Sequence, residues 1–199
     1  MLAAMEEASA EEVRKQFDTN VFGLLNVIRA LLPHMRKQGS GHVINISSLF
    51  AYLNNLPGLG IYGATKYAVE GLSEGLAIEL QPLGIQVTAV APGLFSTEFA
   101  SANSYQSAAV MLDAYNETVG VTRASLGDFH GNQPGDPAKL AQVIIKLAAS
   151  EKVPLYLPVR RDSVKSIREK IALITKEVDE WETVSTATDH ERLAAAVFE

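Results

Sequence analysis

The chain has 199 residues, no cysteine and a formal net charge of -6, with 47% hydrophobic and 20% charged residues. This composition is typical of one globular domain, and the acidic balance argues against a nucleic-acid-binding surface. No disulfide or thiolate metal site can form, the four histidines lack metal-ligand spacing, and no apolar run is long enough to span a membrane. We also recognise no signal peptide, so we expect a cytoplasmic protein without a metal site.

The first predicted element is a helix that begins after Ser9. Ser9 and Glu12 form a capping box, and apolar residues then recur at helical spacing: Val13, Phe17, Val21, Leu24, Leu25 and Ile28. Asn20 lies in the middle of this helix, where asparagine is a mediocre residue. A side-chain hydrogen bond is therefore expected at Asn20.

Two short β-branched segments are predicted to be buried strands. Residues 42–48 (HVINISS) follow a glycine-rich turn and end in two serines, and residues 85–91 (IQVTAVA) run into the rigid turn Pro92-Gly93. Open α/β sheets place their ligand crevices at the carboxyl ends of their strands. We therefore expect the loops after both strands to open on the same rim.

Between these strands, Tyr62 and Lys66 form a Tyr-x-x-x-Lys unit at the start of an apolar helix. Four residues make about one turn, so the phenol and the ammonium are expected on the same helix face. The pKa of a tyrosine lies near ~10, and a neighbouring cation lowers it because it favours the phenolate. Tyr62 is thus a candidate general acid or base. By itself the pattern also fits a half-buried tyrosine beside an exposed lysine.

Beyond the second strand the pattern loosens over residues 98–135, which are rich in Ser, Ala, Asn, Gly and aromatic residues. Such a segment suits a functional loop with some helix. Asp136 and Pro137 then form an N-cap and a first helical turn, which open a helix to about Ala149. Residues 155–157 suit a short last strand bounded by two prolines.

A final amphipathic helix is predicted from Asp162 to about Trp181. Its apolar residues keep helical spacing: Val164, Ile167, Ile171, Ile174 and Val178. The remaining residues, 182–199, are polar and are expected to form a frayed tail.

In this order, the strand, its serine, the tyrosine–lysine helix, the second strand and the Pro-Gly turn resemble the catalytic half of the short-chain dehydrogenase/reductase family. The matching segments are FDTNVFGLLNVIRALLPHM, VINISS, YGATKYAVEGLSEGLAIEL and GIQVTAVAPGLFSTEF, and the resemblance covers nearly the whole chain. It implies an α/β fold, namely a partial Rossmann-like doubly wound parallel sheet with three strands, in a single domain over residues 1–199. It also implies that residues 98–135 are a variable lid over the substrate.

The resemblance places the family's catalytic residues on Asn20, Ser48, Tyr62 and Lys66. Ser48 would bond the substrate oxygen, and Tyr62 would give or take the proton. Lys66 would lower the pKa of Tyr62 and hold the cofactor ribose, and Asn20 would anchor the water that connects Lys66 to solvent. Ser48 precedes Tyr62 by one residue more than is common in the family, which we interpret as a loop insertion.

The cofactor implied by the resemblance is NAD or NADP. Besides Tyr62 and Lys66, the residues assigned to it are those beside the nicotinamide ring: Pro92, Gly93, Leu94 and Thr97. The glycine-rich turn that receives the pyrophosphate is absent from the sequence, which resembles the family only from the end of its fourth strand.

Two functions are compatible with these residues. The first is an oxidoreductase that transfers hydride between NAD(P) and a small-molecule alcohol or ketone. The second is an inactive family member that serves as an association module. The helices that carry Asn20 and Tyr62 are the ones through which a homo-oligomer is expected.

Overall fold

The computed structural model describes residues 1–101 and 104–188 of the chain. Three parallel strands form one sheet in the order β1-β2-β3, with the bounds Gly41–Ile46, Ile85–Pro92 and Tyr156–Val159. The register pairs Gly41 with Ile85 and Ile46 with Val90, and it pairs Ala89 with Tyr156 and Pro92 with Val159. The predicted α/β class with three parallel strands is confirmed.

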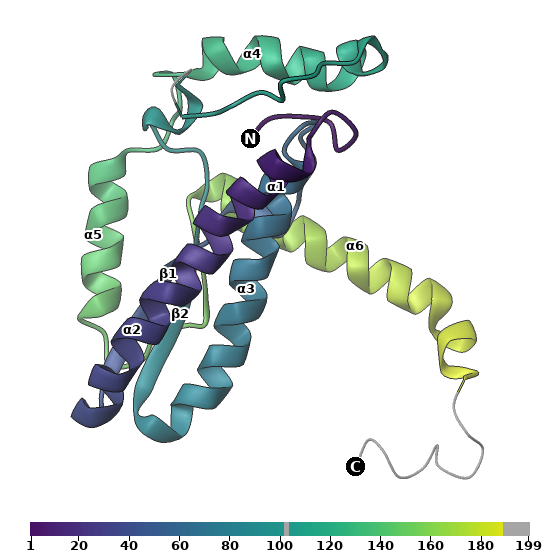
Figure 1. Cartoon of the computed structure of the whole chain (residues 1–199). Coiled ribbons are helices and arrows are strands. Elements are labelled where there is room, and N and C mark those ends of the chain that lie inside the picture. The colour runs from purple at the N-terminus through teal and green to yellow at the C-terminus, as the bar shows by residue number, and fades with distance from the viewer. Residues whose placement is uncertain (102–103, 189–199) are drawn as a thin grey trace.

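Two long helices, α2 (Gly23–Gln38) and α3 (Gly60–Leu80), lie side by side and pack with the sheet (Figure 1). The core between them consists of buried residues from α2, α3 and β2: Ile28, Leu76, Leu80, Ile85 and Val87. The helix α5 (Pro137–Ala148) stands apart from this pair, and Asp136 caps it as expected. Burial of these apolar side chains fixes α3, and with it Tyr62 and Lys66, relative to the strands.

The first helix is interrupted at Asn20. The helix α1 (Ala10–Phe17) begins with the expected capping box, in which Ser9 and Glu12 satisfy each other's backbone N–H groups. A π-helical turn, η1 (Asp18–Phe22), then separates α1 from α2. The predicted helix is present, but the π turn within it was not predicted. A π turn scarcely alters the spacing of apolar residues, so the sequence pattern does not reveal it. Such turns are frequent at functional sites.

Several boundaries differ from those predicted, and the strand β1 ends at Ile46, before the two serines that were predicted to be part of it. The strand β3 includes Pro158, which an edge strand tolerates although proline lacks an N–H group. The helix α6 runs from Arg161 to Thr186, beyond Trp181, because no glycine or proline follows to end it. Residues 182–186 are thus helical rather than part of a tail, while residues 189–199 of that predicted tail lie outside the described residues.

The region predicted as a lid contains four short helical elements. These are the 3₁₀ turns η4 (Glu98–Ala100) and η5 (Asp113–Tyr115), the π turn η6 (Asn116–Gly120) and the helix α4 (Val121–Phe129). Two further 3₁₀ turns, η2 (Leu49–Ala51) and η3 (Gln81–Leu83), follow β1 and α3. Within residues 1–101 and 104–188, we find no helix with the length and hydropathy needed to cross a membrane.

Candidate active site

A cavity of about 730 Å³ lies at the carboxyl ends of β1 and β2. All eight candidate residues from the sequence line it: Asn20, Ser48, Tyr62, Lys66, Pro92, Gly93, Leu94 and Thr97. They come from η1, the loop after β1, the first turns of α3 and the segment that begins at the end of β2. The rim expected from parallel strands thus brings together residues that are distant in the sequence.

The Tyr62 side chain lies beside Ser48, in spite of the extra loop residue between them. Burial raises the pKa of the Tyr62 phenol, and the nearby Ser48 hydroxyl lowers it in part. The Lys66 Nζ lies 5.8 Å from the centroid of the Tyr62 ring. We expected the cation to lower the pKa below its usual value, but in this structure burial dominates and the direction is upward.

Lys66 links the helix to the end of the first strand. Its Nζ donates a hydrogen bond of 2.9 Å to the carbonyl of Ile46, the last residue of β1. Burial lowers the pKa of the ammonium, while the charge of Glu70 one turn further along α3 raises it. Lys66 is therefore held at the cavity wall. Burial disfavours the charged form of its side chain, and the carboxylate of Glu70 favours it.

Asn20 is tied to the same helix through a threonine. Its Nδ2 donates to Thr65 Oγ1 at 3.0 Å, and this hydroxyl in turn donates to the Tyr62 carbonyl at 2.7 Å. The side-chain hydrogen bond expected at Asn20 is thus present. It couples the π turn to the residues around the phenol.

The segment after β2 is held by a carboxylate that the sequence analysis did not single out. Asp162, near the start of α6, accepts a hydrogen bond of 2.8 Å from the backbone N–H of Leu94. A Cβ atom on Gly93 would lie only 1.9 Å from Asp162 Oδ1, so the close approach requires glycine. Arg160, with a φ of 87°, places its Nε 3.0 Å from the same carboxylate oxygen. The only sequence signal was an acidic residue in the first turn of a helix.

A second missed group is a buried carboxyl beneath Lys66. Glu70 is only 5% exposed, and the hydroxyls of Ser47 and Tyr52 approach it without forming hydrogen bonds of regular geometry. Burial raises the pKa of Glu70, and the two hydroxyls lower it in part. Its position four residues after Lys66 was the available signal. Tyr52 packs near Glu70 and does not line the cavity.

The rest of the cavity wall is mainly apolar and aromatic. The Phe99 ring lies 5.3 Å from the Tyr62 ring, and the Phe50 ring lies 6.3 Å from it in an edge-on arrangement. Leu126 and Phe129 of α4 also line the cavity, so part of residues 98–135 does cover it. A mainly apolar wall with a few polar groups is the usual form of a small-molecule site.

The site thus combines a parallel α/β sheet with a serine after β1 and a tyrosine and a lysine one turn apart at the start of α3. Residues 1–108 match the family model described as short chain dehydrogenase. The chain belongs to this family, as the sequence analysis predicted.

Known proteins agree with this membership. The oxidoreductase BOA17 of Botryotinia fuckeliana is 31% identical over 186 residues, which cover 94% of this chain and 67% of that protein. A 3-ketodihydrosphingosine reductase of Bacteroides thetaiotaomicron is 36% identical over 151 residues, covering 76% of this chain and 55% of that protein. The chain thus spans about half to two-thirds of the length of these relatives.

Solved structures agree on the fold. A short-chain dehydrogenase from Streptomyces avermitilis superposes with a TM-score of 0.81 at 42% identity, covering 95% of this chain and 68% of that one. A serine dehydrogenase complexed with NADP+ gives a TM-score of 0.63 at 25% identity, covering 79% of this chain and 59% of that one. The expected cofactor, NAD or NADP, is thus of the kind bound in a solved relative.

Proposed function

We propose that this chain carries the catalytic half of an oxidoreductase that transfers hydride between NAD(P) and an alcohol or carbonyl, with Tyr62 as the general acid or base. The observation that carries the proposal is the position of the Tyr62 phenol, in a mainly apolar cavity, near the Ser48 hydroxyl and one helical turn from Lys66. A buried phenol with a hydroxyl and an ammonium beside it is suited to exchange a proton with a bound substrate. The retained site and the relatives favour this function over that of an inactive association module.

The residues at the cavity suit the nicotinamide and ribose end of the cofactor. Lys66 would hold the ribose hydroxyls, and the backbone from Pro92 to Leu94 with the Thr97 hydroxyl would bind the carboxamide. The close approach at Gly93, where Asp162 leaves no room for a side chain, gives this backbone a fixed shape.

The proton step assigns distinct roles to two hydroxyls. Ser48 donates a hydrogen bond to the substrate oxygen, where negative charge develops during carbonyl reduction. Tyr62 gives its proton to that oxygen, or removes the proton from an alcohol in the reverse direction. The nicotinamide, when bound, supplies or accepts the hydride. Because burial raises the pKa of Tyr62, the protonated phenol is favoured, which is the form that reduction requires.

The apolar wall supports a substrate with an apolar body and one carbonyl or hydroxyl group. Phe50, Phe99, Leu126 and Phe129 offer no charged partner, and the hydroxyls of Ser48 and Tyr62 can bond one oxygen of the substrate. Two relatives carry names that denote apolar substrates, the 3-ketodihydrosphingosine reductase above and a retinol dehydrogenase 8 of Bos taurus, 32% identical over 161 residues. We also propose that residues 98–135 act as the substrate lid.

The test compares Tyr62→Phe with the matched variant Tyr67→Phe, which removes an exposed phenol from the same helix. Binding of NADH and NADPH is measured by calorimetry, and turnover is measured with a panel of apolar ketones. Tyr62→Phe is expected to lower kcat by roughly 10²–10⁴ with nearly unchanged cofactor binding, while Tyr67→Phe keeps both. Turnover that survives in Tyr62→Phe would refute the role of Tyr62. A chain that binds neither cofactor would refute the oxidoreductase assignment for these residues.

The expected homo-oligomer through the helices of Asn20 and Tyr62 stays a prediction. Apolar side chains on these helices are exposed, including Val27 and Leu31 of α2 and Ile78 of α3. Exposed apolar residues on neighbouring helices are compatible with such a contact.

A further inference from the structure

The last helix, α6, leaves the body of the protein and carries apolar side chains into solvent (Figure 1). Its first turns contact β3 and η2, and the buried Ser163 hydroxyl donates to the carbonyl of Ala91 at 2.7 Å. From residue 171 to residue 188 every residue is exposed. Most helices in proteins are stabilised by packing of an apolar face, and within the described residues this half of α6 has no such packing.

The apolar residues of α6 follow a seven-residue repeat. Steps of three and four residues alternate along Val164, Ile167, Ile171, Ile174, Val178 and Trp181. The last four of these are 59%, 46%, 58% and 62% exposed. Alternation of three and four is the spacing of the a and d positions of a coiled coil, and it defines a narrow stripe that suits one partner helix.

Charge is distributed unevenly along the same helix. Residues 161–173 carry four basic and two acidic side chains, whereas residues 174–186 carry one basic and four acidic side chains. This order opposes the helix dipole, which favours acidic residues near the N-terminus and basic residues near the C-terminus. A second helix of the same sequence that runs in the opposite direction would place its acidic half beside the basic half of the first.

We propose that α6 pairs in antiparallel orientation with α6 of a second copy of this chain. One register matches every member of the stripe: Ile171 meets Ile174 of the second copy, Ile167 meets Val178, and Val164 meets Trp181. The same contacts recur by two-fold symmetry, so the interface is self-complementary, as a symmetric dimer requires.

The residues that flank the stripe support this register. Lys170 would face Glu177 of the second copy, and Arg161 would face Glu182, each contact occurring twice. In a parallel pair, Glu177 would instead face Glu182, and like charges oppose association. The ion pairs within α6, Lys165–Glu169 at 3.5 Å and Lys176–Glu180 at 3.6 Å, use residues on the side away from the stripe.

The first test measures the mass of the 199-residue chain in solution by sedimentation velocity over a range of concentrations. Ile174→Glu puts a charge into the stripe, and Leu173→Glu makes the same kind of change next to it but off the stripe. We expect Ile174→Glu to weaken association at least about tenfold and Leu173→Glu to leave it unchanged. A chain that is monomeric throughout, or an assembly that Ile174→Glu does not weaken, would overturn the proposal. Circular dichroism verifies that both variants fold.

Trp181, the single tryptophan of the chain, reports on the same contact. It belongs to the stripe and is 62% exposed within one chain. Association should therefore shift its fluorescence to shorter wavelength, in step with the dimer fraction. Emission that stays unchanged as the dimer forms would place the interface elsewhere and overturn the proposal.

The orientation is tested by charge exchange at Lys170 and Glu177. Lys170→Glu alone or Glu177→Lys alone places like charges opposite each other twice, so each is expected to weaken the dimer several-fold. The double variant restores opposite charges only in the antiparallel register and should recover association. Failure of the double variant to recover it would overturn the antiparallel arrangement. None of these residues lines the catalytic cavity, so the outcome is independent of the proposed activity.

Discussion

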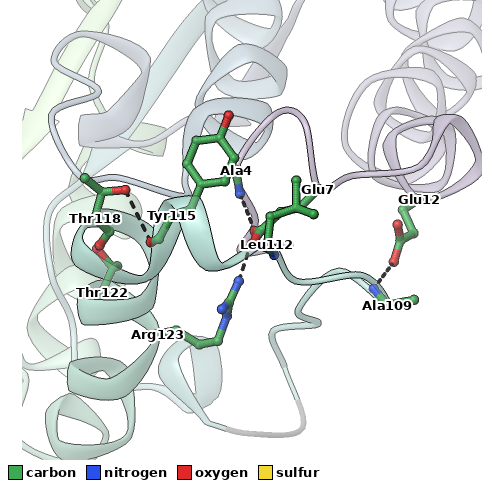
Figure 2. Close-up of polar contacts among 9 residues, drawn as sticks. All are labelled: Ala4, Glu7, Glu12, Ala109, Leu112, Tyr115, Thr118, Thr122 and Arg123. Atoms are coloured by element: carbon green, nitrogen blue, oxygen red, sulfur yellow. Dashed lines mark hydrogen bonds and ion pairs between the residues drawn. The ribbon is translucent and has the colours of Figure 1, made fainter.

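The carboxylate of Glu7 and the guanidinium of Arg123 form an ion pair of 3.0 Å that ties the N-terminal segment to α4 (Figure 2). The Glu7 side chain is almost fully buried, and it also accepts the backbone N–H groups of Ala4 and Leu112 at 2.9 and 3.0 Å. Glu12 of α1 similarly accepts the N–H of Ala109 at 3.0 Å. The N-terminal segment thereby holds α4, whose side chains Leu126 and Phe129 line the cavity of the candidate site.

Replacement of Glu7 by Gln should destabilise the fold, because it leaves the guanidinium without its carboxylate. We expect a loss of about 1–3 kcal/mol in the free energy of unfolding at neutral pH, measured by urea denaturation. Glu11→Gln, at an exposed position in the same region, is the control and should change little. Equal stability of the Glu7 and Glu11 variants would show that the ion pair contributes nothing.

The same carboxylate predicts a loss of stability in acid. Burial alone raises the pKa of Glu7, but the N–H groups of Leu112 and Ala4 and the Arg123 charge outweigh it, so the pKa is below the usual 4.5. A group whose pKa is lower in the folded state stabilises the fold above its unfolded pKa, and this contribution disappears as the pH falls through the folded pKa. The stability difference between the native chain and Glu7→Gln should therefore shrink below about pH 4, in urea titrations at successive pH values. A difference that stays constant down to acid pH would contradict the lowered pKa.

Asp162 and Gly93 should be coupled in stability. Asp162→Ala removes the acceptor of the Leu94 N–H, which we expect to cost about 1–2 kcal/mol. Gly93→Ala should strongly lower the free energy of unfolding of the native chain, because the new Cβ would meet Asp162 Oδ1 at 1.9 Å. In the Asp162→Ala background the same change should cost much less. A double-mutant cycle by chemical denaturation measures the difference, with Asp179→Ala as an exposed control on α6. Additive effects would mean that the close approach does not determine the cost of Gly93→Ala.

The sequence predicted those features that depend on local signals. The capping box at Ser9, a strand over most of residues 42–48 and the spacing of Tyr62 and Lys66 each depend on a few residues, and the structure contains all three, although the strand ends at Ile46. Family order then sufficed to bring Asn20 and Ser48 to the same cavity. The assigned chemical roles stay predictions.

Features that depend on distant contacts were missed. Asp162 holds the Leu94 N–H across 68 positions of sequence, and a single acidic residue at a helix start does not reveal its acceptor. The π turn at Asn20 leaves almost no trace in the apolar pattern. The direction of the Tyr62 pKa was misjudged because a one-turn spacing to Lys66 indicates the cation but not the depth of burial.

The last prediction concerns Glu70, the buried carboxyl beneath Lys66. Burial raises its pKa above the usual 4.5, while Ser47, Tyr52 and the Lys66 charge lower it in part and Glu74 on α3 raises it further. The Tyr156 phenol of β3 lies nearer to Glu74 than to Glu70, and its own pKa is raised mainly by burial and then by Glu74. The carboxyl group therefore lies among groups that only partly compensate its charge.

The sign of the effect on stability follows from the raised pKa. Between the unfolded and the folded pKa of Glu70, the folded state binds more protons, so the unfolding free energy falls as the pH rises through this range. Glu70→Gln removes the ionisable group and should become more stable relative to the native chain between about pH 4 and neutral pH. Urea denaturation at several pH values measures this change, and Glu79→Gln, exposed on the same helix, should run parallel to the native chain. If the stability of Glu70→Gln also followed that of the native chain at every pH, the Glu70 carboxyl group would be ionised in the folded state without cost. Hydrogen bonds with Ser47 and Tyr52 would then have to be stronger than their geometry indicates.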